Sequence, residues 1–327
     1  MTIKYPLAKG KLIKEYLIAL STLPGIGAKR ILKIGNYICD NKIDISSPTD
    51  LLPVLQSLKI KVKQNFVTAS QINEAYCDAQ DLIKTHKSAG IGITTFYDED
   101  YPAILRQTVN EEGKLDPPIV LYYKGNLSIC NMPTLAVIGT REVSEYGRSA
   151  GVFLSQEFAK RGFCIVSGLA IGCDTCGHRG ALDVGGKTVA FLAHGLDTVY
   201  PPENKELAEE IVAKGGLLMS EYPIGDKVNR YNLVARDRLQ AGLSLATLVV
   251  QTGEQGGTMH AANTTLIDGK PLYAIKFKED WQNQEHKTLG NALLVKKGGK
   301  YISGSDNIDS VAAEIRVQVK SNKTLFD

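Results

Sequence analysis

Two apolar runs that end in glycine turns constrain the fold of this chain more than any other feature. The first run ends at Gly139-Thr140-Arg141, and a helix-like segment leads to a second run that ends at Ser167-Gly168. This order predicts a strand, a turn and a helix, followed by a second strand and turn. In a parallel α/β sheet both turns lie at the carboxyl edge of the strands. Glycine turns at that edge, one of them with an arginine, predict a site for phosphate.

The alternation of apolar runs and amphipathic segments continues beyond these two turns. Predicted strands cover Thr134–Ile138, Phe163–Val166, Lys187–Leu192, Gly216–Met219, Ala246–Gln251, Pro271–Phe277 and Lys300–Ser303. Predicted helices cover Gly147–Arg161, Thr175–Val184, Asn204–Lys214, Asn232–Ala241, Thr258–Ile267, Leu289–Lys297 and Ile308–Val319. Apolar strands that alternate with amphipathic helices indicate an α/β fold with a Rossmann-like, doubly wound, mostly parallel sheet.

The first ninety residues instead predict a small helical domain. Apolar residues at helical spacing lie on both sides of the turn Leu23-Pro-Gly-Ile-Gly-Ala-Lys-Arg30, and further helices are predicted near 50–58 and 71–88. A glycine-hydrophobe-glycine turn that opens a helix with basic residues is typical of a helix-hairpin-helix module, whose backbone N–H groups approach nucleic-acid phosphates. A tight turn between two packed helices has the same pattern, so DNA contact by this hairpin stays open.

We expect four parts along the chain. Residues 1–90 form the helical domain, and residues 91–130 form an irregular linking segment. Short strands are expected there, in the stretches Ile91–Tyr97, Tyr101–Leu105 and Pro117–Gly125, because the segment is rich in proline and apolar residues. Residues 131–320 form the Rossmann-like domain, and residues 321–327 form a polar tail.

Charge and composition narrow the class of protein. Lys and Arg number 38 against 35 Asp and Glu, a net charge of +3, so polyanion binding depends on a local patch rather than on the overall charge. No apolar run is long enough to cross a bilayer, and the start of the chain lacks the apolar core of a secretory signal. We therefore expect a cytoplasmic protein. The six cysteines are few for this length, which indicates free thiols.

Glycines and hydroxyl side chains follow five predicted strands in succession. They lie near residues 139–147, 167–174, 194–201, 220–222 and 252–258. Clustered backbone N–H groups, hydroxyl donors and the forked cation of Arg141 indicate a wide anion pocket shared by five strand ends. The first turn differs from the Gly-x-Gly-x-x-Gly dinucleotide fingerprint, and no Gly-Lys-Ser/Thr follows a strand as in a P-loop.

The ordered motifs resemble the DprA/Smf family of bacterial DNA-processing proteins over nearly the whole chain. The matching motifs are Gly139-Thr140-Arg141 with Ser144-x-Tyr146-Gly147, Ser167-Gly168-Leu169-Ala170-x-Gly172-x-Asp174, His178-x-Gly180-Ala181-Leu182, Gly195-Leu196-Asp197-x-x-Tyr200-Pro201, Ser220-Glu221-Tyr222-Pro223, and Arg236-x-Arg238 with Ala241-Gly242-Leu243-Ser244. The resemblance implies a non-enzymatic, dimeric protein that binds single-stranded DNA. It also implies that the protein helps to load a RecA-type recombinase during competence and DNA-mediated transformation, with neither cofactor nor metal.

The motifs and the resemblance together assign a set of residues to DNA or phosphate binding, and no residue to catalysis. They are Gly139, Thr140, Arg141, Ser144, Tyr146, Gly147, Ser167, Gly168, Leu169, Ala170, Gly172, Asp174, Gly195, Arg236, Arg238, Gly256, Gly257 and Thr258.

The chain departs from the family pattern at three places. Asp237 stands where the family has Asn between two arginines, and Leu233-Val234 replaces Phe-Pro. Asp237 either weakens DNA binding or orients an arginine as an ion pair. The third departure, at 256–258, is Gly-Gly-Thr, which resembles Rossmann families that bind or cleave nucleotides. One alternative is therefore a nucleotide-binding or nucleotide-cleaving sensor in phage defence or stress signalling, and another is a scaffold for a partner protein. We expect no C-terminal winged-helix domain in this chain.

Three further groups have both a functional and a structural interpretation. Cys173-x-x-Cys176-x-His178 suggests a zinc or redox site, but the cysteines occupy small apolar positions, which favours packing. His178 and Asp174 are expected to hold the second turn by hydrogen bonds. Glu221 is placed to act as a general base on a nucleotide, and we favour an ion pair with an arginine instead.

Overall fold

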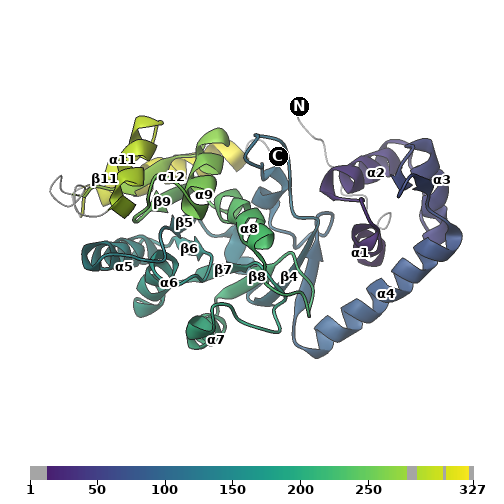
Figure 1. The fold of residues 1–327 in the computed structure, drawn as a ribbon, viewed down its shortest axis with the longest axis horizontal. Helices are drawn as coiled ribbons and strands as arrows, with labels where there is room; N and C mark the ends of the chain where they lie inside the picture. Colours follow the sequence, from purple (N-terminus) through teal and green to yellow (C-terminus); the bar gives the residue numbers. More distant parts are fainter. Residues whose placement is uncertain (1–12, 278–285, 305–306, 324–327) are drawn as a thin grey trace. The chain divides into compact units, whose positions relative to one another are not determined.

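The computed structural model describes residues 13–277, 286–304 and 307–323. Their contacts divide the chain into two compact units (Figure 1). One unit contains the residues up to Tyr101 together with Asp116–Tyr122, and the other contains Pro102–Leu115 and the chain from Tyr123 onward. Among the described helices, none has both the length and the apolar character that crossing a bilayer requires.

The N-terminal unit is mainly helical, which confirms the predicted helical part. Its elements are α1 (Lys14–Thr22), α2 (Ala28–Asp40), η1 (Pro48–Asp50), α3 (Leu51–Ser57), the short antiparallel pair β1 (Lys61–Val62) and β2 (Asn65–Phe66), α4 (Ala69–Ser88) and β3 (Gly92–Thr95). The start of α4 is fixed by a capping box, in which Thr68 Oγ1 accepts from the Gln71 N–H and Gln71 accepts from the Thr68 N–H. No local pattern predicts the two-residue strands β1 and β2.

The predicted hairpin turn lies between α1 and α2. Gly25 adopts a φ of 80°, in the left-handed region that glycine tolerates. Arg30 donates from Nη1 to the carbonyl oxygens of Gly25 and Lys61, at 2.7 and 3.2 Å. Arg30 therefore serves to hold the turn, while Lys29 is exposed. Contact of this turn with DNA stays a prediction.

The second unit contains a parallel sheet, which confirms the predicted Rossmann-like, doubly wound fold. Seven of its strands run in the order β11 (Lys300–Ile302), β10 (Leu272–Ile275), β9 (Ala246–Val249), β5 (Thr134–Ile138), β6 (Cys164–Ser167), β7 (Thr188–Leu192) and β8 (Leu217–Ser220). The chain thus proceeds from β5 to β8 on one side and returns beside β5 with β9. The strand order reverses between β5 and β9, and ligands bind at such a switch point.

Helices cover both faces of this sheet because alternate residues of each buried strand point to opposite faces. Leu135 and Val137 of β5 share a core with α5 (Glu145–Lys160), α6 (Cys173–Asp183) and α12 (Ile308–Lys323). Ala136 and Ile138 share a core with α9 (Gly257–Ile267) and α11 (Leu289–Lys296). The remaining elements are η2 (Ala103–Gln107), β4 (Val120–Gly125), η3 (Leu127–Asn131), η4 (Pro202–Asn204), α7 (Lys205–Ala213), α8 (Arg230–Leu243) and η5 (His286–Thr288).

The predicted strands and helices of the sheet unit agree with the structure, with ends that differ by at most four residues. The strand expected at Tyr101–Leu105 is wrong, because Ala103–Gln107 forms a 3-10 helix. Pro102 offers its carbonyl to the Leu105 N–H, which closes the first turn. Helix α12 extends to Lys323, into the predicted polar tail, and residues 324–327 lie outside the described residues.

Candidate functional site

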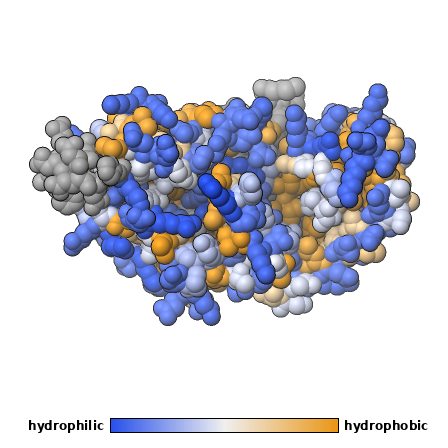
Figure 2. Space-filling view, viewed as in Figure 1, coloured by the Kyte–Doolittle hydropathy of each residue, from blue (hydrophilic) through white to orange (hydrophobic). Residues whose placement is uncertain are grey.

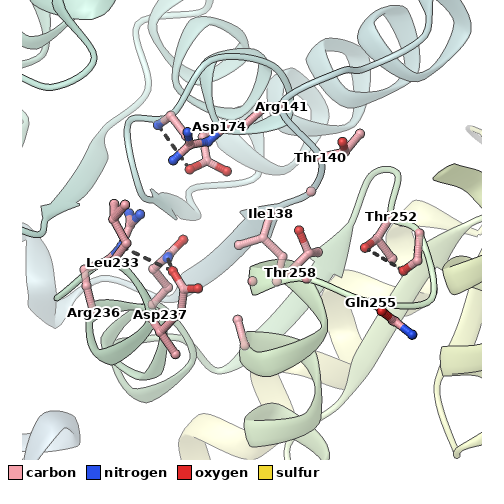
Figure 3. Close-up of a pocket in the computed structure, with 18 of the residues that line it drawn as sticks. Ile138, Thr140, Arg141, Asp174, Leu233, Arg236, Asp237, Thr252, Gln255 and Thr258 are labelled. Atoms are coloured by element: carbon pink, nitrogen blue, oxygen red, sulfur yellow. Dashed lines mark hydrogen bonds and ion pairs between the residues drawn. The ribbon is translucent and has the colours of Figure 1, made fainter. Parts of the chain in front are cut away.

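A cavity of about 600 Å³ opens at the carboxyl edge of the sheet, at the switch point between β5 and β9. It is lined by residues that follow β5, β6 and β9 and by residues of helices α8 and α9; Figure 3 labels several of them. The predicted site residues that line it are Gly139, Thr140, Arg141, Ala170, Asp174, Arg236, Gly256, Gly257 and Thr258.

The other predicted residues do not line this cavity: Ser144, Tyr146, Gly147, Ser167, Gly168, Leu169, Gly172, Gly195 and Arg238. The expectation of a pocket shared by five strand ends was therefore too broad. Strands β7 and β8 lie on the far side of β6 from β9. Their carboxyl ends, which carry Gly195 and Glu221, are accordingly separated from the switch point.

Several of the excluded residues build the loops that shape the cavity. Ser144 Oγ accepts from the Gly147 N–H at 3.1 Å, which caps α5, and donates to Gln251 Oε1 at 2.8 Å. Ser167 Oγ donates to the Val137 carbonyl at 2.6 Å. Sequence reasoning missed the buried Gln251, which follows β9 and ties it to the first turn.

The second turn is held by Asp174, as expected. Asp174 lies in the first turn of α6, and its Oδ2 accepts from the N–H groups of Gly168 and Ala170 at 3.1 and 3.2 Å. Burial raises the pKa of Asp174, and these hydrogen bonds and the charge of Arg236 oppose the rise. The carboxyl group is therefore engaged in positioning backbone rather than free for proton transfer.

Arg236 is a buried arginine at the cavity wall, with only 5% of its surface exposed. Its Nη1 donates to the Phe191 carbonyl of β7 at 2.9 Å. The guanidinium lies against Gly168, where an added Cβ would be 1.6 Å from Nη1. A side chain from α8 thus requires glycine at this position of the second turn, and one donor of Arg236 is used inside the protein.

Asp237 lines the cavity beside Arg236, and its Oδ1 lies 3.3 Å from Arg236 Nε (Figure 3). Oδ1 also accepts from Gln240 Nε2 at 3.0 Å. Burial raises the pKa of Asp237 to about 6, against the attraction of Arg236. Asp237 was expected either to weaken DNA binding or to orient an arginine as an ion pair, and the structure shows an ion pair with Arg236.

Arg238 points to a different partner. Its Nη1 and Nη2 donate to the two carboxylate oxygens of Glu221 at 2.7 and 2.8 Å, and both side chains are largely buried. This bidentate pair confirms the ion-pair interpretation of Glu221 and removes it from consideration as a general base. It also places Arg238 outside the cavity lining.

Exposed cations surround the cavity. Arg141 and Arg230 are exposed, and the Arg141 side chain makes no hydrogen bond or ion pair with any residue in the described part of the chain. Lys287 also lines the cavity and pairs with Glu142. Sequence reasoning missed Arg230 and Lys287. Arg230 could have been found from its helical spacing to positions 233 and 237, whereas Lys287 is far away in sequence.

The first turn of α9 adds backbone donors to these cations. Gly256 adopts a φ of 116°, which glycine tolerates, and no side chain caps the helix. Uncapped N–H groups and the helix dipole favour an anion at this end. The cavity therefore combines exposed cations with fixed backbone donors, which suits a phosphate group.

The cysteine motif belongs to the core. Cys173 and Cys176 are buried, and burial raises the pKa of both thiols. The Cys173 sulfur would lie 2.4 Å from a Cβ at Gly139, so it packs against the first turn. In the ranges covered by the structure, no cluster of three His, Cys, Asp or Glu residues is placed to hold a metal ion.

His178 does not hold the second turn, contrary to the expectation. Its Nδ1 lies 2.6 Å from Thr188 Oγ1 of β7, and not near the backbone N–H groups that Asp174 binds. Burial lowers the pKa of His178 to about 3, so the ring is neutral at ordinary pH. The histidine joins α6 to the sheet.

Comparison with known families gives a match over most of the sheet unit. Residues 92–313 match the family model described as DNA recombination-mediator protein A. The protein Smf of Synechocystis is 39% identical over 231 residues, which cover 69% of this chain and 55% of that protein. The DNA processing protein DprA of Bacillus subtilis is 28% identical over 267 residues, which cover 81% of this chain and 86% of that protein. The chain thus spans about half the length of some curated relatives.

Solved structures give the same result. The DNA processing protein A from Streptococcus pneumoniae matches with a TM-score of 0.71 and 28% identity, over 91% of this chain and 98% of that chain. The DNA processing protein A from Helicobacter pylori, whose structure describes a single-stranded DNA binding mode, matches with a TM-score of 0.57 and 27% identity, over 71% of this chain and 96% of that chain.

Proposed function

Because the chain belongs to the DNA recombination-mediator protein A family, we propose that its switch-point cavity binds the phosphates of single-stranded DNA. The observation that carries this proposal is Arg141, an exposed cavity-lining arginine whose side chain has no hydrogen bond or ion pair within the described ranges. A guanidinium in that condition keeps its donors for a ligand. The uncapped start of α9 lines the same cavity.

The chemistry of the lining suits a backbone contact without sequence readout. Arginine side chains and helix N–H groups bind phosphate oxygens and carry no information about the base. The cations at Arg141 and Arg230 attract a polyanion and release its counterions. Arg236 contributes positive charge from within the wall, where its hydrogen bond to the Phe191 carbonyl helps to fix its position.

Membership of the family supports a further proposal about the cellular role of this protein. We propose that this protein is cytoplasmic, acts as a homodimer, and passes single-stranded DNA to a RecA-type recombinase during DNA uptake. A non-enzymatic role is supported by the carboxylates near the strand ends, since Asp174 holds backbone and Glu221 pairs with Arg238.

The test is the salt dependence of binding to labelled oligo-dT, measured by fluorescence anisotropy for the wild type and for Arg141→Ala. Removing one phosphate contact should weaken binding and reduce the slope of log affinity against log salt by about 1. Arg148→Ala is the matched control, because Arg148 is an exposed arginine on α5 outside the cavity lining, and its slope should equal that of the wild type.

The proposal is overturned if oligo-dT does not bind or if Arg141→Ala leaves the slope unchanged. Competition by nucleoside monophosphates separates the alternative function. Efficient displacement of oligo-dT by a single nucleotide would favour the nucleotide sensor over the DNA-binding protein.

A further inference from the structure

Tyr231 is the most exposed large hydrophobic side chain among the described residues, with 87% of its surface accessible. Apolar residues are scattered among hydrophilic ones on the face shown in Figure 2, and single exposed apolar side chains are ordinary. The exposure of Tyr231 by itself therefore does not indicate a function. The position of Tyr231 relative to the cavity gives it significance.

Tyr231 lies in the first turn of α8, directly after Arg230. Arg230, Leu233 and Val234 all line the cavity. At about 100° per residue, Tyr231 projects about 60° from Val234 around the helix, and residues three apart are neighbours on a helix surface. The aromatic ring therefore lies just outside the cavity-lining face of α8, next to the exposed Val234 at the edge of that face.

Hydrogen bonds hold the first turn of α8 in place, so the backbone that carries the Tyr231 ring has a defined position. Asn229 caps the helix by accepting from the Asn232 N–H at 2.9 Å. Further along α8, Arg236 is anchored to β7 and Arg238 to Glu221. The backbone that carries Tyr231 is held by these contacts while its side chain stays in solvent.

Proteins that bind single strands without sequence preference combine a cationic track for the phosphates with aromatic side chains for the bases. Arg141 and Arg230 supply the cations at this cavity. We propose that Tyr231 stacks against a base of the strand whose phosphate lies in the cavity, an inference that rests on the proposed function. The ligand is accordingly a strand with a base outside the cavity, not a lone phosphate.

The experiment measures the affinity of wild type and Tyr231→Ala for oligo-dT and for an abasic oligonucleotide of equal length and charge. Loss of one stacked base should weaken oligo-dT binding by about 5- to 150-fold. Affinity for the abasic strand and the salt slope should stay unchanged, because no phosphate contact is removed. Tyr231→Phe should retain the affinity of the wild type, since it keeps the ring.

Phe153→Ala is the control, because Phe153 is an exposed aromatic residue on α5 outside the cavity lining. The stacking role is overturned if Tyr231→Ala leaves oligo-dT affinity unchanged, or if it weakens both strands equally. Failure of the proposed function gives a different result: Arg141→Ala then binds both strands as the wild type does, or the wild type binds neither strand.

Discussion

Replacement of Asp237 by asparagine should stabilise the protein in a manner that depends on pH. The side chain is 14% exposed and lies beside Arg236, yet its burial outweighs the attraction of the arginine and raises its pKa from 3.8 to about 6. The ionised form is thus disfavoured in the folded state. Asparagine is similar in shape to the protonated acid and carries no charge to bury.

The size of the effect follows from the two pKa values. Because the folded state holds the proton more tightly than the unfolded chain, the cost of ionising Asp237 is absent below about pH 4, grows as pH rises, and is complete above the folded pKa. The difference between 3.8 and about 6 corresponds to about 3 kcal/mol at pH 8, and to about 1.5 kcal/mol at pH 5. Asp237→Asn should recover these amounts.

The assay is urea unfolding of both proteins at these two pH values. Asp78→Asn is the control, because Asp78 is exposed on α4, and its stability should equal that of the wild type. Loss of the carboxylate should also tighten oligo-dT binding most at the higher pH. The reasoning is refuted if Asp237→Asn is no more stable than the wild type at pH 8, or if its gain is the same at both values.

Three other predictions follow from contacts around the site. Gly168→Ala places a Cβ where the Arg236 guanidinium lies, so urea unfolding should show a loss of about 3 kcal/mol from displacing that buried charge; an unchanged midpoint would contradict this packing. Glu221→Ala removes both carboxylate acceptors of the largely buried Arg238 and should cost about 3 kcal/mol in the same assay, whereas the salt slope of oligo-dT binding should stay as in the wild type. Alkylation of the native protein, followed by mass spectrometry, should label the exposed Cys77 and spare Cys173 until the protein unfolds, because burial raises the pKa of Cys173; rapid labelling of Cys173 would show that it is accessible.

The strands and the two glycine turns could be predicted because they depend on local patterns. The segment Thr134–Ile138 has four consecutive apolar residues after Thr134 and is followed by a glycine turn, and the observed β5 has the same bounds. Tyr101–Leu105 misled the prediction, since apolar residues beside a proline suit either a short strand or a 3-10 turn.

The extent of the cavity could not be predicted, because it depends on strand order. Nothing in the sequence states that β9 returns beside β5, which brings α9 to the first turn and leaves Gly195 outside. The sequence also does not show which arginine is buried, because Arg236 and Arg141 both stand in conspicuous motifs. Only tertiary packing shows that Arg236 is anchored to Phe191 while Arg141 is exposed.

The central claim is that the cavity between β5 and β9 holds a phosphate of single-stranded DNA. A crystal structure with a short oligo-dT tests it most directly. The account predicts a phosphate bonded to the Arg141 guanidinium and to backbone N–H groups at the start of α9. An oligonucleotide bound elsewhere with the cavity empty, or a base in place of the phosphate, would contradict it.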